Sequence, residues 1–121
     1  MKSKIFIISL LTSIVLHSCD CWVILSGNLI DSKTNEPISG AELKFLNIES
    51  TDYSKSNDSI IVSMVFKTDS KGHFSMMSNN YGFCPNIEPI VMIQKEGYKP
   101  MKFTVKNNLE RNGLTVKLEK K

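Results

Sequence analysis

Strict alternation of apolar and polar residues in short segments is the feature that most limits how this chain can fold. The pattern is clearest in Met101–Lys106 (MKFTVK) and Leu114–Glu119 (LTVKLE), where every second side chain is apolar. A period of two residues places alternate side chains on opposite faces of a β-strand. Turn-forming residues separate the segments, and no useful length of sequence follows the period of an amphipathic helix. The pattern predicts an all-β fold.

We predict one β-sandwich of seven short strands. The segments are Trp22–Ile30, Ala41–Ile48, Ile60–Lys67, His73–Met77, Pro89–Lys95, Met101–Lys106 and Leu114–Glu119. A long corner with Asn35, Glu36 and Pro37 is expected to join the first two strands. Gly27 inside the first strand predicts a bulge or a close approach of another backbone.

The third and fourth segments carry two further expectations. Alternation over Ile60–Lys67 would direct Ile60, Val62, Met64 and Phe66 to the core, after a polar loop over Glu49–Ser59. Thr68–Gly72 then predicts a tight hairpin connection into His73–Met77, in which Gly72 takes a positive φ.

The N-terminal residues have the pattern of an export signal. Lys2 and Lys4 precede an apolar run of 12 residues, Ile5–Leu16. A basic start, a short apolar run and a small residue before the cut are typical of a secretory signal peptide. A membrane-spanning helix needs roughly 20 apolar residues. We therefore expect residues 1–18 to be removed and residues 19–121 to form a single domain.

Leu16-His17-Ser18-Cys19 resembles the lipobox of bacterial lipoproteins. Leu lies at −3, a small residue at −1 and Cys at the cut, whereas His17 departs from the usual residue at −2. The resemblance implies that Cys19 becomes the acylated N-terminus of a protein anchored to the bacterial cell envelope, and we expect the outer membrane. The alternative is an ordinary signal peptide with an incidental Cys.

If Cys19 is acylated, Cys21 and Cys84 remain as an even pair in an oxidising compartment. A disulfide between them would fasten the Asn79–Asn86 loop to the start of the first strand. Two unpaired thiols, or a disulfide with a partner, are the alternatives. Neither residue has further ligands at the spacing of a zinc site, so no metal is expected.

Four segments carry turn and strand motifs: Gly27–Asp31 with Asn35–Ala41, Thr68–Ser75, Lys95–Tyr98 and Leu114–Leu118. Together they resemble the carboxypeptidase regulatory-like domain, a transthyretin-like (prealbumin-like) Greek-key β-sandwich. The four segments span nearly all of the mature chain. The motifs consist of turn and core residues, and they indicate a fold without a reaction. In Lys95–Tyr98, Gly97 would open a bend while Tyr98 buries its ring and bonds its hydroxyl to a backbone group.

The sequence gives little support for an enzyme activity. Processing leaves one His, His73, in a polar setting, and no His or Asp pattern accompanies Cys84 to activate its thiol. Some transthyretin-like proteins are hydroxyisourate hydrolases, whose several His and Arg residues and terminal Tyr-Arg-Gly-Ser are missing here. Asp31, Asp52, Asp58 and Asp69 lack the spacing of a calcium loop. We expect no enzyme activity and no cofactor.

The remaining expectations concern partners. Loss of Lys2 and Lys4 leaves a net charge of about +1, which does not favour nucleic acid. Tyr53, Tyr81 and Phe83 lie in irregular loops and are candidates for contact with a protein or glycan, unless Tyr81 and Phe83 cap one end of the sandwich. The sequence favours a non-catalytic lipoprotein whose sandwich binds or scaffolds another envelope protein. A surface lipoprotein that binds a glycan or small ligand is the alternative.

Overall fold

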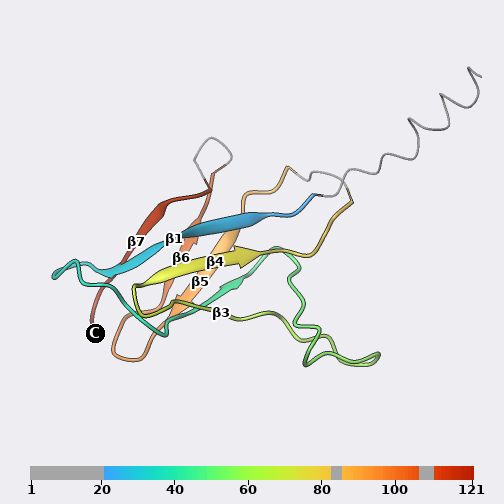
Figure 1. Cartoon of the computed structure of the whole chain (residues 1–121), viewed down its shortest axis with the longest axis horizontal. Coiled ribbons are helices and arrows are strands. Elements are labelled where there is room, and N and C mark those ends of the chain that lie inside the picture. Colours follow the sequence, from blue (N-terminus) through green and yellow to red (C-terminus); the bar gives the residue numbers. More distant parts are fainter. Residues whose placement is uncertain (1–20, 83–85, 107–110) are drawn as a thin grey trace, which may run out of the picture.

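A computed structural model describes residues 21–82, 86–106 and 111–121. Seven strands lie in these ranges: β1 (Ile24–Asp31), β2 (Glu42–Phe45), β3 (Phe66–Lys67), β4 (His73–Met77), β5 (Ile90–Gln94), β6 (Met101–Thr104) and β7 (Leu114–Leu118). They form a three-stranded sheet, β4-β1-β7, and a four-stranded sheet, β3-β2-β5-β6. The two sheets pack as a sandwich (Figure 1). The predicted all-β class and the seven strands are confirmed.

β1 is the central strand of the smaller sheet. It pairs antiparallel with β4 and parallel with β7. Leu25 and Leu29 point inward and are fully buried. Gly27 lies between them opposite Leu114, where an added Cβ would come within 2.1 Å of the Leu114 carbonyl oxygen. The predicted close approach of two backbones at Gly27 is therefore confirmed.

The core lies between the sheets and follows the predicted alternation in most strands. Phe74 and Met76 of β4 point inward, and β5 is an inner strand of its sheet, as its apolar sequence indicated. The rings of Phe45 and Phe66 meet edge to face at 6.1 Å. The buried apolar residues are Val23, Leu25, Leu29, Ile38, Ala41, Leu43, Phe45, Ile48, Phe74, Met76, Val91, Ile93, Val105, Val116 and Leu118.

The predicted hairpin at Thr68–Gly72 is wrong in one respect. The turn forms, with φ of 75° at Gly72 and with Asp69 Oδ1 accepting hydrogen bonds from the backbone N–H groups of Lys71 and His73. However, β3 pairs with β2 and β4 pairs with β1, so the turn joins the two sheets and not two paired strands. Turn residues specify a reversal of the chain, but the sheet that each strand enters depends on distant contacts.

The predicted third strand is mostly wrong. Only Phe66–Lys67 forms β3, and the preceding residues fold back on the chain, with Asp52 N–H bonded to Val62 O and Met64 N–H to Ser50 O. Ile60 is 55% exposed, contrary to its expected place in the core. The side chain of Asn57 accepts hydrogen bonds from Ser59 and Ile60 N–H and closes a tight turn there. This polar turn sets the local pairing and leaves Ile60 outside the core, whereas Val62, Met64 and Phe66 keep the predicted alternation and are partly buried.

Replacing Gly27 with Ala should lower the free energy of unfolding by about 1–3 kcal/mol, the usual cost of forcing volume into a packed site. The added methyl group would push β7 away from β1 at Leu114. Urea denaturation measures the change. The matched control is Ser26→Ala, which removes only a surface hydrogen bond to Asn112 and should cost less than about 1 kcal/mol. Equal stability of the two variants would contradict the prediction.

Candidate functional site

The N-terminal cysteines lie partly within the described residues. Cys19 and Cys84 fall outside them. Cys21 is disulfide-bonded. Its N–H donates to Asn80 Oδ1 at 3.1 Å, and its carbonyl accepts from Tyr81 N–H at 2.9 Å. The start of the described chain is thus held against the loop that follows β4, the loop to which a disulfide was predicted.

The candidate contact residues do not form one cluster. Tyr53 is 77% exposed, whereas Tyr81 packs against the core and accepts a hydrogen bond from Glu49 N–H through its hydroxyl. Phe83 lies outside the described residues. Tyr81 therefore has a structural role at one end of the sandwich, and Tyr53 is the more accessible of the two rings.

The described part of the chain contains neither a metal site nor a membrane-spanning helix. No group of three or more His, Cys, Asp or Glu side chains there could hold a metal ion. No helix there is long and apolar enough to span a bilayer. His73 lies exposed on β4.

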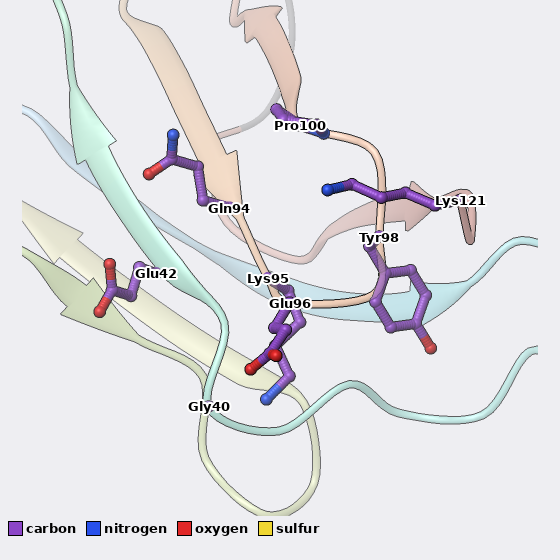
Figure 2. Close-up of a pocket in the computed structure, with 8 residues that line it drawn as sticks. All are labelled: Gly40, Glu42, Gln94, Lys95, Glu96, Tyr98, Pro100 and Lys121. Atoms are coloured by element: carbon purple, nitrogen blue, oxygen red, sulfur yellow. The ribbon is translucent and has the colours of Figure 1, made fainter.

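A polar groove of about 450 Å³ lies at the end of the sandwich opposite the start of the described chain (Figure 2). The start of β2, the end of β5, the β5–β6 turn and the last residue form it. Figure 2 shows the Lys121 amine extending towards the middle of the group. The lining side chains carry both signs of charge, and the residues are Gly40, Glu42, Gln94, Lys95, Glu96, Tyr98, Pro100 and Lys121.

Buried Asp31 contacts one residue of this groove, Tyr98. Its carboxylate accepts hydrogen bonds from the backbone N–H groups of Lys33 and Thr34 and, at 2.9 Å, from the Tyr98 hydroxyl, while Lys120 Nζ lies 3.8 Å away. Tyr98 was expected to bond to a backbone group, and a side-chain carboxylate 67 residues away takes that place. The contact orients the Tyr98 ring at the edge of the groove.

The electrostatics follow from these contacts. The backbone hydrogen bonds from Lys33 and Thr34 lower the pKa of Asp31 to about 2; they outweigh burial, which raises it, and the Tyr98 hydrogen bond and Lys120 charge add to the lowering. Burial and the bond to Asp31 raise the pKa of Tyr98. Asp31 is therefore ionised and Tyr98 protonated at neutral pH.

An apolar seam runs between β6 and β7. Two hollows of about 250 and 430 Å³ lie along it and share Met101 and Lys117. Phe103 and Leu114 line the first and are only partly buried. The second shares Pro100 with the polar groove. Seam and groove thus form one continuous surface, apolar along the strands and polar at the end of the sandwich.

The seam is flanked by the outer edges of two sheets. β6 and β7 are edge strands, and among the described residues no further strand pairs with them. In β6 the backbone N–H and C=O groups of successive residues point alternately towards β5 and away from it. Val105 N–H donates to Pro89 O, on the side of β5. The N–H groups of Lys102 and Thr104 therefore point away from β5, towards the open edge. Such an edge has the hydrogen-bonding groups that an added strand would need. The alternation of apolar and polar residues predicted both strands. It gave no sign that β6 and β7 would lie in different sheets without pairing to each other.

The lowered pKa of Asp31, caused mainly by the backbone hydrogen bonds from Lys33 and Thr34, predicts a pH-dependent stability. Since the Asp31 pKa is lower in the folded chain than its ordinary 3.8, its stabilising effect is complete above pH 3.8, declines as the pH falls towards 2, and is absent below that. Thermal unfolding of the wild type and of Asp31→Asn between about pH 2 and pH 5 measures it. The wild type should unfold at the higher temperature at pH 5, and the difference should shrink on acidification. A constant difference would contradict this role for the charge.

Comparison with known proteins identifies a fold and no family. No family model and no curated protein matches the chain. Among solved structures, it is similar to 3-chlorocatechol 1,2-dioxygenase from Rhodococcus opacus 1CP, with a TM-score of 0.55 and 15% identity over 88% of this chain. The match spans 62% of the length of the dioxygenase. At this identity the likeness concerns the fold alone. The chain is a β-sandwich domain that distantly resembles the C-terminal β-sandwich of that dioxygenase.

Proposed function

We propose that this chain is a bacterial cell-envelope lipoprotein, anchored to the outer membrane through Cys19, whose β-sandwich is a non-catalytic protein-interaction module. The lipobox-like residues 16–19 support the anchor. The finer family assignment, a carboxypeptidase regulatory-like domain, is supported by its turn motifs. Gly40, Gly72 and Gly97 of those motifs all adopt positive φ, which suits glycine at each position.

The observation that carries the interaction function is the seam between β6 and β7. An extended segment of a partner could pair with the outward N–H and C=O groups of β6, and every second side chain would then enter the apolar hollows. Met101 and Phe103 supply apolar contact beneath such a segment. Where the segment leaves the seam at Pro100, the charged side chains of the polar groove meet its end.

Addition of a strand explains the two features of the seam together. The outward backbone groups at Lys102 and Thr104 have the spacing that would pair with an added strand. The apolar hollows alone would suit many small molecules, but only a polypeptide also completes the row of backbone bonds. Main-chain bonds would supply affinity, and the side chains that enter the hollows would supply selectivity.

Site-specific photo-crosslinking in intact bacteria tests the proposal. A photoreactive amino acid replaces exposed Lys102 on β6, and in the control it replaces exposed His73 on β4, an edge strand of the other sheet. We expect one defined protein adduct from position 102 and none of the same mass from position 73. Mass spectrometry then identifies the partner. Cys19→Ala should abolish the adduct if the anchor brings the partners together.

A proline substitution separates edge pairing from other contacts. Thr104→Pro removes an outward N–H and leaves the bonds between β5 and β6 in place, which edge strands tolerate. We expect it to abolish the adduct from position 102, while Thr104→Ala keeps it. A position-102 adduct that survives Thr104→Pro would contradict strand addition. If neither position gives an adduct although the protein is in the membrane fraction, the interaction function fails.

A further inference from the structure

Exposed apolar side chains gather at the end of the sandwich where the described chain begins. Trp22, Tyr53 and Met77 line one hollow of about 350 Å³, and Ile24 lies directly opposite Met77 in the β1–β4 ladder. All four are more than 40% exposed. We call these four residues the anchor-end patch. The hollow contains no charged side chain; its other residues are Thr51, Met64, Phe66, Ser78, Asn79 and Asn80.

Three distant segments build this patch on one end of the molecule. Figure 1 shows residues 50–64 projecting from the same end of the sandwich as the start of β1, whereas the C-terminus and the β1–β2 turn lie at the opposite end. The side chain of Asn79 fixes the segments relative to one another, because its oxygen accepts from Thr51 N–H and its amide donates to Thr51 Oγ1, both at 2.9 Å. Position 53 is therefore held close to Trp22 despite the distance in sequence.

The connection to Cys19 is short. Three peptide steps separate Cys19 from Trp22, which span at most about 10 Å when fully extended. Cys21, one step before Trp22, is already held to the fold by its disulfide and by hydrogen bonds to Asn80 and Tyr81. An acylated Cys19 would therefore leave this end of the sandwich within about 10 Å of the lipid headgroups.

We infer that the anchor-end patch rests on the surface of the bilayer into which the acyl chains of Cys19 insert. The inference rests on the lipid anchor of the proposed function. Trp and Tyr favour the membrane interface because their rings are apolar while one polar group still meets water. Met77 and Ile24 add apolar area. The nearby charges of Asp52 and Lys55 form an ion pair at 3.8 Å, so a largely zwitterionic surface suits the patch.

Tryptophan fluorescence tests the contact, since Trp22 is the single Trp of the chain. The lipidated protein is purified from membranes and reconstituted in phosphatidylethanolamine-rich vesicles with or without brominated acyl chains. The reporter variant is Trp22→Phe with Tyr53→Trp, which moves the fluorophore to a position far from Cys19 in sequence. The matched control is Trp22→Phe with Lys33→Trp, at an exposed site in the β1–β2 turn at the other end.

We expect binding to vesicles to shift the emission from position 53 to shorter wavelength, and brominated lipid to reduce its intensity, while position 33 is unaffected by either. Vesicle-bound protein with no quenching at position 53, or with equal quenching at both positions, would overturn the patch and leave the anchor intact. Protein that fails to float with the vesicles would overturn the anchor and the patch together. A photoreactive residue at position 53 that cross-links to a protein in intact cells would also overturn the inference, because a protein would then cover the patch.

Discussion

The hydrogen bonds of buried Thr68 hold together two of the four places where the chain crosses between the sheets, the β1–β2 and β3–β4 corners. Its hydroxyl donates to Ile38 O and accepts from Ala41 N–H, and its backbone bonds to Gly40 N–H and Ala41 O. Where the chain passes from one sheet to the other, its backbone N–H and C=O groups have no partner strand. Burying these groups without hydrogen bonds would destabilise the fold. Thr68 supplies those partners for the β1–β2 corner from the β3–β4 corner. On this side of the sandwich, the relative position of the two sheets depends on this contact.

On the opposite side of the sandwich, contacts beside the polar groove join the two sheets. Tyr98 and Lys120 form an antiparallel β-bridge, and the backbone N–H of Lys99 donates to the carbonyl of Glu119. The side chains of Lys99 and Glu119 also form an ion pair at 3.4 Å. Beyond this junction β6 and β7 belong to different sheets and flank the apolar seam. Asp31 reinforces the junction through Tyr98 and Lys120. The seam and the polar groove are continuous because this junction lies where they meet: Tyr98 lines the groove, and Lys99 and Glu119 line the adjoining hollow.

The sequence predicted those features that depend on neighbouring residues. The alternation of β4, β6 and β7 and the close approach at Gly27 were all visible in it, because each reflects a local periodicity or a missing side chain. The third strand was mispredicted because the Asn57 turn competes with the apolar pattern. The seam and the Asp31–Tyr98 contact were not predicted. Both arise where segments far apart in sequence meet, and a single sequence contains no local signal for such a meeting.

The short link between Cys19 and the fold joins the two proposals. A long flexible linker would let the sandwich turn freely above the membrane, but a link of three peptide steps, with Cys21 already fixed, leaves little such freedom. If the anchor-end patch lies on the bilayer, the polar groove points away from it and the seam runs along the side of the domain. A partner strand would then be bound at a set height above the lipid. The partners that such a seam favours are therefore envelope proteins with an extended segment close to the membrane surface.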